Sequence, residues 1–188
     1  MRSFVCVLAL SIGYLSTSAQ ETNNRHKNYV EIGYTGGLYS GAGAGGVYGA
    51  AGFFFKAFGK ASSIDFRAKE IYISKPERES GALSLTYRLF LTKGYYLGAG
   101  FAHNHEVPFD KYKEDIVASS IGNGKYIIHR SGLAAETGYD FGSLMKKGWL
   151  GIYPHVNLSV AYMALDHEPN PLVTLSVGFR FGVKEIQE

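Results

Sequence analysis

The sequence predicts an all-β fold, an eight-stranded antiparallel up-and-down transmembrane β-barrel, from three observations. Side chains along a strand alternate between its two faces, and several segments alternate between apolar and small or polar residues. The clearest segment, residues 172–183, places Val173, Leu175, Val177, Phe179, Phe181 and Val183 on one face. Its other face is small or polar with a single charge. Compact and long connections also alternate along the chain, as in barrels with short turns at one end.

Residues 1–19 have the features of a signal peptide, which leaves residues 20–188 as the predicted outer membrane β-barrel domain. Arg2 precedes an apolar run over 4–15, and small residues at 17–19 precede the expected cleavage before Gln20. The apolar run is too short for an ordinary transmembrane helix. The only cysteine, Cys6, lies in this segment, so the mature chain is expected to carry no thiol chemistry.

Composition narrows the function classes further. Twenty-four glycines, fourteen tyrosines and twelve phenylalanines against five prolines favour a tightly packed β-rich chain. The net charge of +3 is too small to indicate nucleic-acid binding. After the signal peptide no stretch is apolar enough for a transmembrane helix, so a membrane location would require a barrel.

Eight strands are expected where the alternation holds, at 28–39, 47–58, 61–75, 82–91, 95–107, 126–141, 149–162 and 172–183. The compact connections are 59–60, 92–94 and 142–148, and the longest loop is 108–125. An even strand number returns both termini to the same side, which is the periplasm in bacterial barrels.

Three local irregularities carry predictions of their own. The glycine-rich segment 40–46 lacks the lysine and hydroxyl residue that end a phosphate loop, and it predicts a flexible hairpin. The alternation changes phase near Glu70-Ile71, and Pro154 interrupts another strand, so each position suggests a β-bulge.

A soluble eight-stranded barrel of the lipocalin type is the structural alternative, since it also alternates. It would turn its second face to water, where lysine and glutamate should dominate. Here that face is mostly glycine, alanine, serine, threonine and asparagine, which fits the narrow lumen of an eight-stranded barrel. Aromatic residues gather beside the compact turns, as in a membrane interface: Tyr95, Tyr139, Phe141, Phe179 and Phe181.

With its export signal, eight alternating segments, and Phe179 and Phe181 in the last strand, the chain resembles the small outer membrane β-barrels typified by the transmembrane domain of outer membrane protein A. The resemblance implies a location in the cell outer membrane, contact with membrane lipid including lipopolysaccharide, and insertion by the outer membrane assembly machinery. In that family a terminal aromatic commonly ends the last strand, whereas here residues 182–188 follow. We expect a monomer without a cofactor.

The leading functional hypothesis is a non-catalytic barrel that anchors surface loops. A second hypothesis is an outer-leaflet lipid A or phospholipid acyl hydrolase, because His129 and Ser131 share one strand face and could pair as base and nucleophile. The pair is similar to the His-x-Ser of lipid A 3-O-deacylases, but Gly132-Leu133 stand where that family has Asn-Ala. Glu136 has lumen parity and is a poor third member.

A third hypothesis is surface metal binding. His103 and His105 share one face of a strand, and His129 is expected on the neighbouring strand at a similar height, so three imidazoles could converge. The alternative explanation is that these are ordinary interfacial histidines at the level of the lipid headgroups.

A lumen charge network is expected near the periplasmic end, formed by Glu31, Asp65, Arg88, Glu136 and Arg180. Their parity points all five side chains inward, and acids and bases are nearly balanced. A buried unpaired charge costs several kcal/mol, so pairing is expected. Eight strands leave no water-filled channel once side chains are placed, which predicts a closed lumen.

Overall fold

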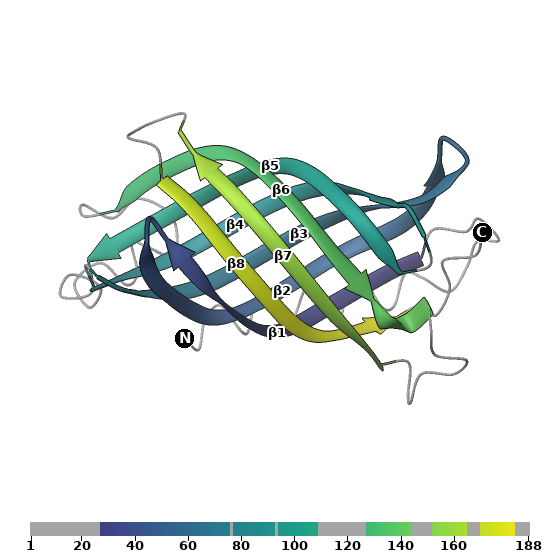
Figure 1. Cartoon of the computed structure of the whole chain (residues 1–188), viewed down its shortest axis with the longest axis horizontal. Coiled ribbons are helices and arrows are strands. Elements are labelled where there is room, and N and C mark those ends of the chain that lie inside the picture. Colours follow the sequence, from purple (N-terminus) through teal and green to yellow (C-terminus); the bar gives the residue numbers. More distant parts are fainter. Residues whose placement is uncertain are drawn as a thin grey trace.

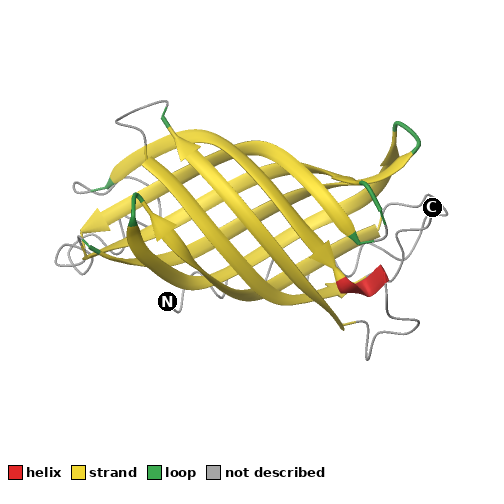
Figure 2. Cartoon of the chain, viewed as in Figure 1, coloured by secondary structure: helices red, strands yellow, loops and turns green. Residues whose placement is uncertain are grey.

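The computed structural model describes residues 27–75, 77–92, 94–108, 127–143, 152–164 and 170–182. Eight antiparallel strands close into one barrel in the order β1 to β8, which confirms the predicted fold class (Figure 1). The strands are β1 Lys27–Tyr39, β2 Ala42–Ala57, β3 Lys60–Ser74, β4 Glu77–Phe90, β5 Tyr95–Pro108, β6 Ile128–Asp140, β7 Ile152–Met163 and β8 Asn170–Gly182. A short 3-10 helix, η1 Phe141–Ser143, follows β6 (Figure 2). None of the described residues forms a helix long and apolar enough to cross a membrane.

The two ends of the barrel differ. At one end, called the turn end, lie the start of β1, the end of β8, η1 and the compact β2–β3 and β4–β5 connections; it is on the right of Figure 1. The opposite end is called the loop end. Phe58 and Gly59 both have positive φ, of 51° and 76°, as a two-residue type I′ hairpin turn requires. The predicted signal peptide and most of the predicted loop 108–125 lie outside the described residues.

The glycine-rich hairpin is much tighter than the predicted loop over 40–46. Only Ser40 and Gly41 form the turn, with φ of 47° and 85°, and β2 begins at Ala42. At Gly46 the strand packing requires glycine, because a Cβ there would stand 1.9 Å from the carbonyl oxygen of Glu70 on β3. At Gly43 and Gly45 a Cβ would make ordinary contacts, at 3.4 and 3.8 Å.

Neither predicted bulge exists. The β2–β3 and β3–β4 registers run without interruption past Glu70, and the β7–β8 register runs without interruption past Pro154. The apparent phase change in β3 arises because Ile71 and Ile73 point into the lumen, where the preceding inward residues are polar. Pro154 lies one residue beyond the last β6–β7 pair, Asp140 with His155, so the ladder loses no partner on that side.

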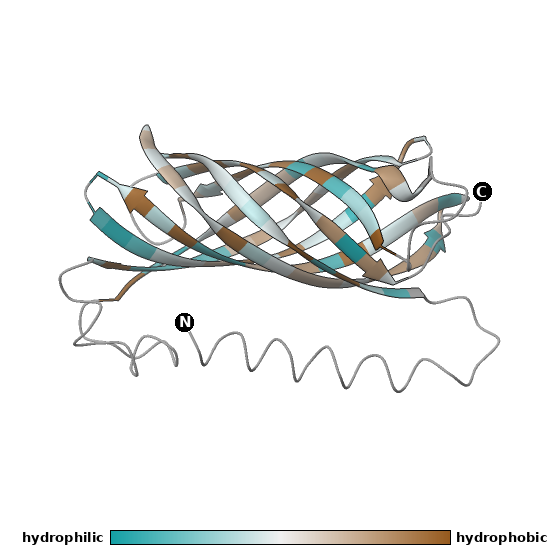
Figure 3. Cartoon of the chain, turned by 90° about the horizontal axis from the view of Figure 1, so that it is seen from below, coloured by the Kyte–Doolittle hydropathy of each residue, from teal (hydrophilic) through white to brown (hydrophobic). Residues whose placement is uncertain are grey.

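The distribution of polar and apolar residues is the reverse of that in a water-soluble protein. The outer wall exposes apolar side chains such as Phe101, Leu133 and Val177, whereas Glu31, Asp65 and other charged residues are buried in the lumen. Figure 3 shows apolar and polar residues alternating along the strands. The expected aromatic residues lie on the outer surface at the turn end, with the rings of Tyr139 and Phe141 4.9 Å apart.

Candidate functional site

The lumen is filled in layers. Next to the turn end is a cluster of aromatic rings, Tyr29, Phe54, Phe90 and Tyr96. Nearer the loop end is an apolar layer made of Tyr39, Ile71, Ile73, Ala82, Ala102, Ala134, Ala161, Met163 and Leu172. Between the two layers lies a group of buried charges, which is enclosed by packed apolar groups on both sides.

The charge network is centred on Arg67 and Arg88. Arg88 Nε lies 2.7 Å from Glu136 Oε1, and its NH2 nitrogen lies 3.0 Å from Asp65 Oδ1. Arg67 NH2 lies 2.7 Å from Glu31 Oε2. Glu31 is fully buried, and Asp65, Arg67 and Arg88 are at most 2% exposed in their side chains. These carboxylates and guanidinium groups therefore neutralise one another's charges in a buried part of the lumen, where water does not solvate them.

Each of the two strongest pairs crosses an intervening strand over a small residue. Arg88 on β4 and Glu136 on β6 both face Gly98 of β5 in the ladder. Likewise, Glu31 on β1 and Arg67 on β3 both face Ala50 of β2. A Cβ at Gly98 would come within 2.7 Å of Glu136 Cγ, so glycine makes room for the ion pair.

Neutral polar residues complete the network. Asn157 Nδ2 donates to Glu136 Oε2 at 2.8 Å, and its Oδ1 accepts from Arg67 at 2.8 Å. The hydroxyl of Tyr96 lies 2.9 Å from His155 Nε2, and His155 Nδ1 lies 3.3 Å from Glu31. The network is thus larger than the sequence suggested, because Arg67, His155 and Asn157 belong to it. Their inward parity was visible in the sequence, but their partners were not.

Arg180 lies apart from this centre. It faces Glu31 in the β1–β8 register, yet its ion pair is with Asp140, and its guanidinium lies over the ring of Phe54, 5.0 Å from the centroid. The five predicted lumen charges are therefore all inward, with Glu31, Asp65, Arg88 and Glu136 in one network and Arg180 in a separate contact nearer the turn end.

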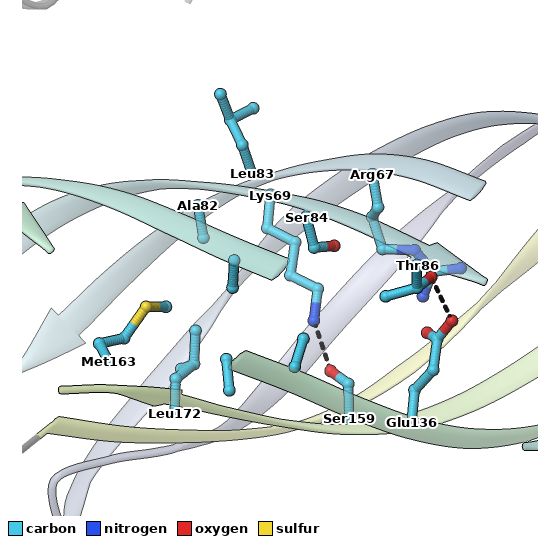
Figure 4. Close-up of a pocket in the computed structure, with 13 residues that line it drawn as sticks. Arg67, Lys69, Ala82, Leu83, Ser84, Thr86, Glu136, Ser159, Met163 and Leu172 are labelled. Carbon is cyan, nitrogen blue, oxygen red and sulfur yellow. Dashed lines mark hydrogen bonds between the residues drawn. The ribbon is translucent and has the colours of Figure 1, made fainter. Parts of the chain in front are cut away.

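A small cavity separates the charges from the apolar layer. The volume in which the centre of a water molecule can lie is about 20 Å³, enough for a single water molecule. Lys69 reaches into it and donates to Ser159 Oγ at 2.8 Å, while Leu83 points away (Figure 4). Four alanines line it, Ala82, Ala102, Ala134 and Ala161. Their size leaves this space, which is too small for an organic ligand.

A second charged cluster lies inside the loop end, and the sequence reasoning missed it. The fully buried Glu106 accepts from Arg78 at 3.1 Å and pairs with Arg130 at 2.9 Å. The hydroxyl of Tyr39 also donates to Glu106. The only available signal was the shared inward parity of Glu106, Arg78 and Arg130.

The three candidate histidines meet on the outer wall near the loop end. One ring nitrogen from each histidine lies within 4.8 Å of the other two, and each residue is at least partly exposed. His105 and His129 face each other across the β5–β6 ladder, and His103 Nε2 lies 2.8 Å from His105 Nε2. The predicted spatial convergence of His103, His105 and His129 is therefore present.

The serine of the hydrolase hypothesis has a different partner from the expected one. Ser131 Oγ lies 2.8 Å from Nδ1 of His103, whereas among the described residues it makes no hydrogen bond with His129. His103 is in turn backed by His105, with no carboxylate of the described chain behind it. Ser131 also stands in the β5–β6 ladder opposite His103, so the backbone N–H groups that bond to β5 are unavailable for an oxyanion hole. The geometry therefore gives little support to acyl transfer.

No protein-family model matches the sequence, and the search of curated proteins found no match. Among solved structures, Neisserial surface protein A (NspA) shares 14% identity with a TM-score of 0.53, over 88% of this chain and all of that one. Ail of Yersinia pestis shares 13% identity (TM-score 0.45, 84% of this chain and 100% of that one). The N-terminal barrel domain of Pseudomonas aeruginosa OprF shares 15% (TM-score 0.40, 84% and 98%). The similarity to NspA confirms the expected resemblance at the level of the fold.

Proposed function

We propose that this chain is a non-catalytic outer membrane β-barrel that anchors surface loops and has a lumen closed to solutes. The observation that carries the proposal is the inverted burial, with an apolar outer wall around fully buried, mutually paired charges. An apolar wall of this kind is stable against lipid, and a barrel leaves no unpaired strand edge in the membrane. The outer membrane, with its lipopolysaccharide, is the compartment in which such barrels occur.

In this proposal the turn end faces the periplasm and the loop end faces outward. The longest connection, between β5 and β6, leaves from the loop end, and bacterial barrels have their longer loops on the extracellular side. The predicted alternation of compact and long connections is not kept, because the loop end also has the two-residue connections between β1 and β2 and between β3 and β4. The chain would be inserted as a monomer by the outer membrane assembly machinery after removal of residues 1–19. Fractionation of the envelope and N-terminal sequencing test this step: we expect an outer membrane protein beginning at Gln20. A mature protein that keeps residues 1–19 would contradict it.

The closed lumen is supported by three successive obstructions: the aromatic cluster, the charge network and the apolar layer. Planar-bilayer recordings of the purified protein test it directly. We expect no stable open state, because packed side chains fill the described lumen at each of these three levels. A steady large conductance from the unmodified protein would overturn the proposal.

The anchoring role predicts that the barrel folds without its longest connection. Residues 109–125 can be replaced by a short glycine-serine linker. In the comparison variant, a glycine-serine linker replaces the compact 92–94 turn. We expect the loop variant to keep the heat-modifiable electrophoretic mobility of a folded barrel. Loss of folding on loop replacement would contradict the division between a barrel scaffold and dispensable loops.

A further inference from the structure

We propose that His103, His105 and His129 bind one divalent transition metal ion such as Zn²⁺ on the outer wall of the barrel, and that Ser131 is a positioning residue for this site. Imidazole is a ligand that suits zinc, copper and nickel. Three histidines with an open fourth position form a recognised type of zinc site. This inference is independent of the closed lumen and of the loops.

The three imidazoles converge because of strand geometry. His103 and His105 are two residues apart on β5, so both point to the outer face. The register then places His129 of β6 directly opposite His105, with ring centroids 4.5 Å apart. Three of the six histidines in the chain thus share one spot on the outer wall. Scattered interfacial histidines would not require this convergence.

The spacing is close to that of a bound ion. Zinc–nitrogen bonds of about 2.0–2.1 Å at tetrahedral angles place two ligand nitrogens roughly 3.4 Å apart. The nitrogens of His103 and His105 lie 2.8 Å apart, and all three residues offer nitrogens within 4.8 Å. Small rotations of partly exposed rings, without movement of the backbone, can bring all three to the required distance.

Ser131 fixes the tautomer that the site needs. When Nδ1 of His103 carries the proton, it donates to Ser131 Oγ, 2.8 Å away, and Nε2 is left as an acceptor. Without a metal this lone pair accepts from Nε2–H of His105, 2.8 Å away, and a bound ion would take the place of that proton once His105 carries its proton on Nδ1. Histidine ligands usually donate their other ring N–H to an outer partner of this kind, which orients the ring. The serine that suggested a nucleophile therefore has a supporting role.

The approach to the cluster is open. Gly81 on β4 faces His105 in the ladder, and a Cβ built there meets nothing within 4 Å. This missing side chain leaves room beside His105 for a water molecule or another ligand in the fourth position of the metal. On the turn-end side of the cluster, the exposed Phe101 and Leu133 continue the apolar wall. The site therefore lies at the border of the lipid-facing surface that is nearer the loop end.

The test is Zn²⁺ titration by calorimetry of the purified full barrel, prepared without a polyhistidine tag. We expect one ion per chain with micromolar or tighter affinity. His105→Asn removes a ligand and should weaken binding by more than the roughly 10–100-fold typical of losing an outer partner. Ser131→Ala should weaken it within that 10–100-fold range, and Ser131→Thr, which keeps the hydroxyl, should restore it. Glu77→Gln, an exposed change elsewhere at the loop end, should leave the affinity unchanged.

The triple variant in which His103, His105 and His129 are all asparagine separates this site from His26 and His167. Equal binding by the triple variant and the unmodified protein would overturn the proposal. A cobalt(II) titration of the unmodified protein gives a reading that needs no variant. We expect the visible bands of a four-coordinate ion with nitrogen ligands; a spectrum of six-coordinate aqueous cobalt only would also overturn it.

Discussion

The lumen charge network and the outer-wall histidine cluster are two polar groupings that differ in how completely their atoms are occupied. Arg88 is buried, and its guanidinium lies near the carboxylates of Glu136, Asp65 and Glu31. The histidines are partly exposed and chiefly contact one another and Ser131. A buried network of paired charges stabilises a fold, whereas an exposed histidine cluster can exchange its internal contacts for a ligand.

The largest expected effect is on the network itself. Arg88→Ala removes the common partner of Glu136 and Asp65. Glu136 then keeps the neutral donors Thr86 and Asn157, and Asp65 keeps Arg67 at 3.5 Å. Removing one member of a buried pair costs about 3–5 kcal/mol of unfolding free energy. Urea unfolding of the barrel in lipid vesicles measures this loss. Glu77→Ala, at an exposed position, should change stability by less than about 0.5 kcal/mol. Similar losses of unfolding free energy in Arg88→Ala and Glu77→Ala would show that the charge network does not stabilise the barrel.

The next effect concerns the glycine beneath the ion pair. Gly98→Ala places a methyl group 2.7 Å from Glu136 Cγ and 3.2 Å from Arg88 Cγ, in a packed part of the lumen. Overpacking of this kind costs about 1–3 kcal/mol. Gly81→Ala is the matched control, because the same methyl group meets open space there. Equal unfolding midpoints for the two glycine variants would show that the Arg88–Glu136 pair does not need the small residue.

A smaller effect is expected at the edge of the network. Tyr96→Phe removes the hydroxyl that accepts from Asn157 at 2.8 Å and lies 2.9 Å from His155 Nε2. Leaving such buried groups without a partner costs about 1–3 kcal/mol, and the aromatic ring still fills the cluster. Unfolding of Tyr96→Phe beside Tyr95→Phe, which changes an exposed ring, measures the difference. If Tyr96→Phe lowered the unfolding free energy no more than Tyr95→Phe does, the Tyr96 hydroxyl would not be part of the network.

Much of the fold could be predicted because strand alternation is local. The side that each residue faces follows from parity, so Glu31, Asp65 and Arg180 could be placed inside from the sequence. Residue polarity did not identify the inward face where the lumen itself becomes apolar. Ile71 and Ile73 face inward there, and the resulting change in the alternation was interpreted as a bulge. The chemistry along one strand therefore identifies a face only when the lumen has one character throughout.

The pairings were harder to predict because they connect strands that are not neighbours. Glu31 meets Arg67 across β2 and Arg88 meets Glu136 across β5, each over a small residue that parity alone does not single out. On the outer wall the same limit applied to Ser131, whose partner is the cross-strand His103 and not His129, two residues away. Register links these residues, and register depends on turn lengths such as the short Ser40–Gly41 turn.

The smallest expected effect is none at all, and it separates a binding cluster from a catalytic one. If Ser131 orients His103 and does not attack an ester, Ser131→Ala should leave the lipid A and phospholipid acyl patterns of cells identical to those with the unmodified protein. Mass spectrometry of both lipid classes, with cells lacking the protein as the reference, measures this. A serine nucleophile would instead make Ser131→Ala cells match the cells that lack the protein, with both differing from the unmodified strain. That outcome would require the Ser131–His103 contact to act as a nucleophile and base, with an oxyanion hole supplied by groups other than the N–H groups that pair β6 with β5.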